Sequence, residues 1–266
     1  MPSSLSRTLS GALTAGAVLT QVAHPLLRGE GLRRTTIGSV VAFAAASVTD
    51  AARRGGPRAA ATTLAVAGGL GLVAEAVGTR TGRPFGRYRY AGTLGPQVLD
   101  VPVVVPLAWT MLAHPAVQLG RHLARDLPAG TRDVVAVGAA AWTLASWDLF
   151  LDPQMTTAGH WSFETPRPHL PGVPGIPLSN YAGWLLTAVT ICGALHATTR
   201  TDGGATTEAV PQTVPAVLLG WTWLGSALGN AAFFRRPVVA AYGGVAMGLT
   251  VLPYLRSVLA GRDVRP

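Results

Sequence analysis

Apolar runs of about 20 residues recur along the whole chain and alternate with shorter polar segments. Runs of this length and composition are typical of membrane-spanning helices. The expected fold class is therefore an all-α polytopic integral membrane helix bundle, in which residues 1–266 form a single transmembrane domain. We predict about eight spans, which run near residues 10–27, 36–52, 58–78, 98–117, 133–151, 179–197, 211–234 and 237–257.

The composition agrees with this pattern. Of the 266 residues, 49% are hydrophobic and only 12% are charged, whereas soluble chains carry about 25% charged residues. The net charge is +9, and all 21 basic residues are arginines, most of them in short segments between apolar runs. A nucleic-acid-binding protein gathers its basic residues on one soluble face. We therefore expect no nucleic-acid partner, and a multi-pass protein of the cell membrane.

Two loops are too long and too rich in aromatic residues to be simple connectors. They cover residues 78–97 and 152–178, and both combine Gly and Pro with Phe, Tyr, Trp and Arg. Proline restricts the backbone and glycine permits tight turns, so we expect these loops to fold back over the mouth of the bundle. For Tyr88 and Tyr90, anchoring at the membrane interface is an equally good interpretation.

Glu75 is the most informative single residue, because it lies inside the third apolar run. A carboxyl group at membrane depth is costly and is rarely left facing lipid. Gly68, Gly71, Gly78 and Gly82 lie on or near the same helix face, so this face can pack closely against other helices with Glu75 pointing inward. A functional role is favoured over the alternative, a protonated structural residue.

Asp148 and Asp152 are spaced so that a helix places both on one face. Pro153 is expected to end that helix at Asp152, which makes Asp148 the deeper of the two. Burial and a neighbouring negative charge both favour the neutral form of a carboxyl group, so one of the pair is expected to stay protonated. Asp100 is either another carboxyl group of the site or a plain interfacial residue.

The sequence predicts no metal site and no cofactor. His24, His114 and His160 show no metal-ligand spacing, Cys192 is the only cysteine, and no phosphate-binding loop is present. Asp-rich motifs of intramembrane prenyltransferases bind a magnesium diphosphate, but the chain has only one such segment, DLFLD. The arginines between residues 80 and 89 could hold a diphosphate, so this alternative stays open.

Aromatic residues gather in and next to the two loops. Aromatic faces stabilise cations, and together with protonatable carboxyl groups they suit a hydrocarbon substrate that passes through a carbocation. An aromatic belt at the membrane interface accounts for some of these residues equally well. The candidate substrate-binding residues are Tyr88, Tyr90, Trp109, Trp147, Trp161, Tyr181 and Trp184.

Two segments together resemble a known family. EAVGTRTGRPFGRYRYAGTLGPQVLDVPVVVPLAW, residues 75–109, and DLFLDPQMTTAGHWSFE followed by GIPLSNYAGW, within residues 148–184, are similar to the two signatures of membrane proteins of carotenoid biosynthesis. This is the carotenoid hydratase family, which includes bisanhydrobacterioruberin hydratases of C50 carotenoid pathways and γ-carotene hydratases. The chain departs from the pattern at Asp100 and in a Pro-rich insert at residues 165–174.

The resemblance implies addition of water, without a cofactor, to a terminal isoprenoid double bond of an acyclic or monocyclic carotenoid, which gives a tertiary alcohol. Glu75, Asp148, Asp152 and Asn180 fall on matching motif positions and are the candidate catalytic residues. We expect Asp148 or Glu75 to be the acid, and Asp152 and Asn180 to position water.

The implied partners are a carotenoid or isoprenoid lipid substrate, the membrane and other enzymes of the carotenoid pathway. The alternatives are an intramembrane prenyltransferase, a cyclase or isomerase acting on an isoprenoid lipid, a small transporter, and a non-catalytic carotenoid-binding protein.

Overall fold

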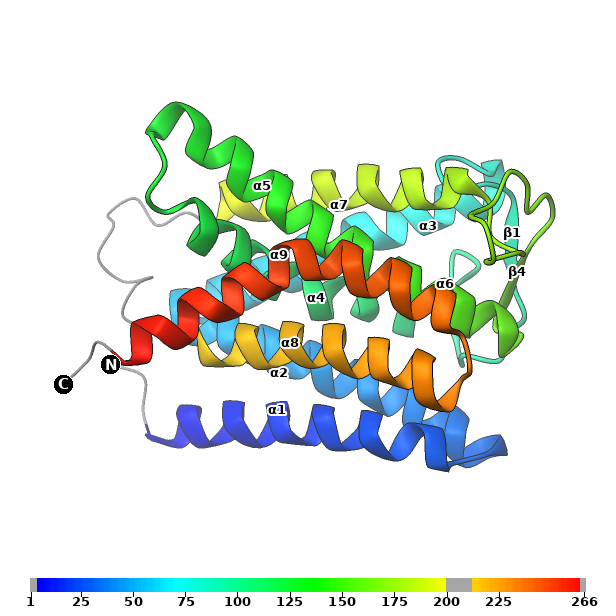
Figure 1. The fold of residues 1–266 in the computed structure, drawn as a ribbon, viewed down its shortest axis with the longest axis horizontal. Coiled ribbons are helices and arrows are strands. Elements are labelled where there is room, and N and C mark those ends of the chain that lie inside the picture. Colours follow the sequence, from blue (N-terminus) through cyan, green and yellow to red (C-terminus); the bar gives the residue numbers. More distant parts are fainter. Residues whose placement is uncertain (1–3, 200–211, 264–266) are drawn as a thin grey trace.

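The computed structural model describes residues 4–199 and 212–263, which form an all-α bundle with two small two-stranded sheets at one end (Figure 1). The α-helices are α1 Ser4–Ala23, α2 Gly29–Thr63, α3 Gly69–Thr81, α4 Val104–Ala124, α5 Ala129–Ser146, α6 Asp148–Thr157, α7 Leu178–Thr198, α8 Thr213–Leu228 and α9 Pro237–Asp263. Shorter elements are the 3₁₀ turn η1 His24–Leu26, the π-helical turns η2 Leu64–Gly68 and η3 Gly229–Phe233, and the strands β1 Tyr88–Tyr90, β2 Gln97–Val98, β3 Val101–Pro102 and β4 Trp161–Phe163.

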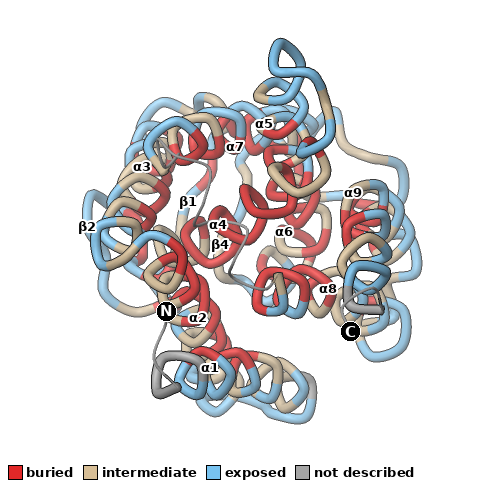
Figure 2. Tube along the Cα trace, turned by 90° about the vertical axis from the view of Figure 1, so that its left-hand side faces the viewer, coloured by how far each residue is buried: buried red, intermediate tan, exposed pale blue. Residues whose placement is uncertain are grey.

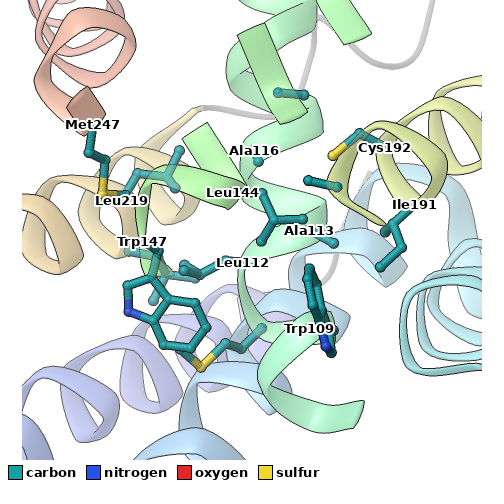
Figure 3. Packing of buried hydrophobic residues seen from close by; sticks show 14 of the residues in the cluster. Trp109, Leu112, Ala113, Ala116, Leu144, Trp147, Ile191, Cys192, Leu219 and Met247 are labelled. Atoms are coloured by element: carbon teal, nitrogen blue, oxygen red, sulfur yellow. The ribbon is translucent and has the colours of Figure 1, made fainter. Parts of the chain in front are cut away.

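Helix α4 is the centre of the bundle and is buried along most of its length (Figure 2). It packs against α2, α5, α7, α8 and α9. Small residues allow this: a Cβ atom on Gly120 would lie only 2.0 Å from the carbonyl oxygen of Ala136, so α4 and α5 are in backbone contact there. Ala113 and Ala116 face the same core as Cys192 of α7 (Figure 3).

Four helical segments of the described chain are long and apolar enough to cross a membrane: Gly29–Thr81, Ala129–Thr157, Leu178–Thr198 and Pro237–Gly261. Helices lie at the predicted spans, but the number of eight membrane crossings is not confirmed. Residue 211, the first of one predicted span, lies outside the described residues. The central α4 is not among the four; it carries polar residues such as His114 and Gln118, which are buried against the surrounding helices.

The longest of these segments folds back on itself at Gly55 and Gly56. Gly56 has φ 72° and ψ −174°, which a residue with a side chain rarely adopts. Ser47, before this break, donates a hydrogen bond to the carbonyl oxygen of Thr110 at 3.3 Å. Gly68, after it, packs against the side chain of the same Thr110. Two antiparallel helical arms therefore line one side of α4.

The strands were not expected from the apolar pattern. β1 pairs with β4 in antiparallel register, with Tyr88 opposite Phe163 and Tyr90 opposite Trp161. This pairing joins the two long loops at one end of the bundle (Figure 1). The predicted loop fold-back is thus present, and its basis is a two-stranded sheet that covers the bundle end.

Two predicted boundaries are wrong. The fourth span was expected to begin at residue 98, but α4 begins only at Val104. Residues 97–102 instead form the β2–β3 hairpin. Its turn residues Leu99 and Asp100 have positive φ angles of 54° and 66°.

Pro153 was expected to end a helix at Asp152, but α6 continues to Thr157. α5 ends at Ser146 and α6 follows after Trp147, which itself keeps helical backbone angles. Pro153 has no N–H to donate within α6, and the helix continues past it.

Candidate functional site

A cavity of about 870 Å³ is lined by residues of α1, α2, α3, α4, α6, α7, α8 and α9, the turns η1 and η3, and the β1–β4 sheet. This volume is in the upper part of the range of about 300–1,000 Å³ for small-molecule sites. Most of its lining residues are apolar. The predicted site residues that line it are Glu75, Tyr88, Tyr90, Trp109, Trp147, Asp152, Trp161, Asn180 and Trp184.

Glu75 is buried and accepts hydrogen bonds from three side chains. Trp109 Nε1 donates to Oε1 at 3.1 Å, Tyr90 donates to Oε2 at 2.8 Å, and the Tyr88 hydroxyl donates a short hydrogen bond to the same Oε2. An ionised carboxylate is purely an acceptor, and donors that converge on it stabilise the charged form. This arrangement therefore suits a carboxylate that will accept a proton.

The glycines of α3 make this environment possible. A Cβ atom on Gly71 would lie 2.6 Å from Trp109, and one on Gly78 would lie 2.8 Å from Phe85 and 3.0 Å from the Tyr88 hydroxyl. Side chains at these positions would push the donors away from Glu75. The predicted close-packed glycine face is present, and it packs against the residues that surround the carboxyl group.

Asp148 and Asp152 share one amide group as hydrogen-bond donor. Asn180 Nδ2 donates to Asp148 Oδ2 at 2.7 Å and to Asp152 Oδ2 at 2.5 Å. Trp161 Nε1, from β4, donates to Asp152 Oδ1 at 3.1 Å. Two carboxyl groups held this closely in a buried site cannot both ionise readily, so the pair is suited to keep one proton.

The two aspartates differ in their access to the cavity. Asp152 lines it, whereas Asp148 is fully buried behind it and its Oδ1 has no hydrogen-bond partner in the described part of the chain. Asp148, a candidate catalytic residue, does not line the cavity itself and is connected to it through the cavity-lining Asn180 and Asp152. Both carboxyl groups are buried.

Aromatic side chains form much of the cavity wall. Trp109 and Trp184 stack at 4.0 Å between ring centroids, and Trp147 meets Trp184 edge to face at 6.0 Å. Tyr90 and Trp161 meet in the same way across the β1–β4 sheet. Tyr88 and Trp184, two of the candidate substrate-binding residues, are buried and pack against the core.

The phenols of Tyr88 and Tyr90 remain hydrogen-bond donors over the whole ordinary pH range. Burial raises the pKa of both groups well above the usual value, and the neighbouring Glu75 carboxyl raises it further. Both tyrosines come from β1, outside the helical segments, so the loop contributes donors to a carboxyl group of α3.

Other predicted residues lie away from the cavity. Tyr181 does not line it, and its buried hydroxyl has no partner in the described residues. Asp100 is exposed and lies 3.8 Å from Arg80, which makes it a surface residue. Arg89 pairs with Glu164 at 3.0 Å on the outer face of the sheet.

No arginine is found among the described residues that line the cavity. The cluster between residues 80 and 89 thus offers no charge to a bound diphosphate inside it. Within the same described residues, no group of three or more His, Cys, Asp or Glu side chains has the geometry to hold a metal ion.

Several cavity residues were not among the candidates from the sequence. Phe85 and Phe163 flank Tyr88; the three-residue strands that place Phe163 leave no periodic signal that could have found it. Gln21 and Asn230 also line the cavity; they are isolated polar residues in apolar helices, and this was the signal that could have found them.

Comparisons with known proteins relate the chain to carotenoid biosynthesis. Residues 35–250 match the model of a family described as carotenoid biosynthesis protein. A bisanhydrobacterioruberin hydratase of Haloarcula japonica is 38% identical over 128 residues, which cover 45% of this chain and 41% of that relative; the match thus spans less than half of the relative's length. No solved structure shows a significant match. Because the family model covers most of the sequence, the chain belongs to the carotenoid biosynthesis protein family.

Proposed function

We propose that the chain is a carotenoid hydratase, a hydro-lyase that adds water to the terminal isoprenoid double bond of the ψ-end of an acyclic or monocyclic carotenoid. One observation carries the proposal: two distinct carboxyl sites, Glu75 with its three donors and the Asp148–Asp152 pair, meet at one apolar cavity with aromatic walls. Family membership and the name of the relative support a carotenoid as the substrate.

The two carboxyl sites suit opposite roles. Asp152 faces the cavity and shares a proton with Asp148, so we assign it as the acid. Glu75, which three donors favour as a carboxylate, is assigned as the base. This assignment modifies the expectation from sequence, in which Asp148 or Glu75 was the acid, because Asp148 does not line the cavity. Two carboxyl groups can act as an acid–base pair when the environment of one favours its neutral form and the environment of the other favours its charged form.

The proposed reaction balances without a cofactor. Asp152 transfers its proton to the less substituted carbon of the terminal alkene, and the positive charge develops on the tertiary carbon. The faces of Trp109 and Trp184 stabilise this cation. A water oxygen forms the new C–O bond, and Glu75 takes the released proton. Transfer of one proton back to the aspartate pair restores the starting state.

The competing functions fit the cavity less well. A prenyltransferase or any enzyme that binds a diphosphate needs cationic groups or a metal at the phosphate, and the described cavity lining provides no arginine. A cyclase or isomerase would use the same cation but would exclude water. A protein that only binds a carotenoid does not need a buried pair of carboxyl groups, which is costly at membrane depth.

Expression in a lycopene-producing host tests the proposal. We expect a new, more polar pigment whose mass exceeds that of the parent by one water, and whose hydroxyl group carries ¹⁸O when the cells grow in H₂¹⁸O. A product of unchanged mass would indicate an isomerase or cyclase. Unchanged pigments with carotenoid retained on the purified protein would indicate a binding protein, and either result would overturn the proposal.

Variants of the carboxyl groups test the assigned roles. Asp152→Asn and Glu75→Gln should each lower turnover by at least about 100-fold, the usual contribution of an acid or base. Asp148→Asn should retain measurable turnover, because Asp152 still lines the cavity and can carry the proton. Near-normal turnover of Asp152→Asn would refute its role as the acid.

A further inference from the structure

The large cavity has an open side at the edge of the bundle, where α1 lies beside α2 and α8 (Figure 1, Figure 2). Some large hydrophobic residues line the cavity and are also exposed on the surface of the described chain. All of them belong to two stretches, α1 with η1 and α8 with η3: Val22, Leu26, Val217, Leu224, Leu228 and Phe233. We call the gap between these two stretches the lateral opening.

A hydrogen bond joins the two sides of the lateral opening at one point. Trp221 Nε1 of α8 donates to Gln21 Oε1 of α1 at 2.8 Å. The Trp221 ring packs directly against its own helix, because a Cβ atom on Gly225 would lie only 3.1 Å from it. Val217, before this bridge, is 40% exposed, whereas Leu228, after it, is 65% exposed. The cavity is therefore most open on the C-terminal side of the bridge.

The surface that the lateral opening presents is apolar. The amide oxygen of Gln21 is taken up by Trp221, and His24 Nε2 lies 2.8 Å from Thr36 Oγ1. No arginine, and no acidic residue other than Glu75 and Asp152, is found among the described residues that line the cavity. A lipid headgroup would need cationic partners for its phosphate. The opening therefore fits an uncharged hydrocarbon chain.

We propose that the lateral opening binds the polyene chain of the substrate, whose reacting end lies inside the cavity. The inference rests on the proposed function for the identity of the substrate, and it adds the surface that holds the rest of the molecule. Restricted rotation keeps a conjugated chain extended, as partial double-bond character does in a peptide bond. The chain cannot coil up beside Glu75 and Asp152, so it must leave the cavity, and the exposed apolar residues continue the cavity wall to the outside.

A reversible block of the lateral opening tests this assignment. Leu228→Cys places a thiol in the opening, and Leu249→Cys on α9 is the matched control. The two leucines are 65% and 64% exposed, but only Leu228 lines the cavity. The native Cys192 is buried, so a bulky methanethiosulfonate reagent attaches to the introduced thiol. Quenching of tryptophan fluorescence by lycopene in detergent gives the affinity before labelling, after labelling and after reduction with dithiothreitol.

We expect labelled Leu228→Cys to bind lycopene about tenfold more weakly than before labelling, which equals about 1.4 kcal/mol. Reduction releases the label and should restore the affinity, which shows that the variant is folded. Labelled Leu249→Cys should bind lycopene as wild type does. Binding is measured without turnover, so the result does not depend on the assigned acid and base.

Several results would overturn the inference. They are an unchanged affinity of labelled Leu228→Cys, an equal loss in both labelled variants, and a loss that reduction does not reverse. A wild-type dimer that the label on Leu228→Cys converts to a monomer, at unchanged lycopene affinity, would assign this face to a second copy of the chain. If the label blocks binding but wild type adds no water to bound lycopene, the proposed hydration fails while the lateral opening stands. Normal hydration by labelled Leu228→Cys would refute the opening and leave the proposed function intact.

Discussion

At the scale of single residues, the state of Glu75 depends on side chains that the chain supplies from a distant loop and helix. Tyr88, Tyr90 and Trp109 each provide one donor. Two effects oppose each other at this residue: burial favours the neutral acid, whereas the three donors favour the carboxylate. The base of the proposed reaction is thus defined by its neighbours and not by its own position in a helix.

We expect Tyr88→Phe to lower turnover by roughly 100-fold, the loss that follows removal of one positioned donor from a charged site, with little change in substrate binding. Steady-state kinetics on the purified protein measures the split between kcat and KM. Tyr242→Phe is the matched control, because this tyrosine packs against the core outside the cavity. Wild-type kcat in Tyr88→Phe would show that the hydroxyl does not support the base.

At the scale of elements, α3 acts as a close-packed wall whose glycines set how near α4 and the β1 loop approach. Gly82, at the end of α3, has φ 76° and its N–H bonds to the Gly78 carbonyl at 2.8 Å. This left-handed cap turns the chain directly into the loop that carries the two tyrosines. The same glycine face therefore positions both the helix partner and the loop partner of Glu75.

Gly71→Val tests the close approach between α3 and the Trp109 side chain of α4. Its branched side chain meets the Trp109 ring, so we expect a loss of about 1–3 kcal/mol of stability from overpacking together with a loss of turnover, as Trp109 leaves Glu75. Thermal unfolding in detergent measures the loss of stability, and pigment conversion measures the loss of turnover. Gly69→Ala, with no atom within 4 Å of the added methyl group, should instead stabilise α3 by up to about 1 kcal/mol.

At the scale of the whole molecule, a second buried polar cluster ties α2 to α4 away from the cavity. Asp50 of α2 bonds Arg54 Nε at 2.6 Å and lies 3.1 Å from His114 Nε2 of α4. None of these residues lines the large cavity. The charged cluster between α2 and α4 is therefore separate from the carboxyl groups that line the cavity.

Asp50→Asn should destabilise the bundle by about 3 kcal/mol, because it leaves the buried Arg54 charge without its carboxylate. The melting temperature in detergent should fall clearly, while pigment selectivity below that temperature should not change. Glu30→Gln, which breaks exposed ion pairs to Arg33 and Arg34, should have little effect. A change of pigment selectivity in Asp50→Asn would show that the cluster is coupled to the cavity.

Much of the site was predictable from local patterns. A glutamate in an apolar run, two aspartates at helical spacing and glycines on the Glu75 face are all visible in the sequence. The strands, the true start of α4 and the continuation of α6 past Pro153 were not, because two- and three-residue strands leave almost no periodic signal, and positive φ at Leu99 and Asp100 has no reliable mark in residue type.

Hydrophobic length and the cost of a buried charge are local properties, so the all-α bundle with apolar helices and inward-facing carboxyl groups could be predicted from the sequence. Which carboxyl group lines the cavity could not. Asp148 and Asp152 share one helix face in the sequence pattern, whereas in the folded chain Asp152 lines the cavity, bonded by Asn180 and Trp161, and Asp148 does not. Such a difference arises from contacts between segments far apart in the chain, and no local pattern contains it.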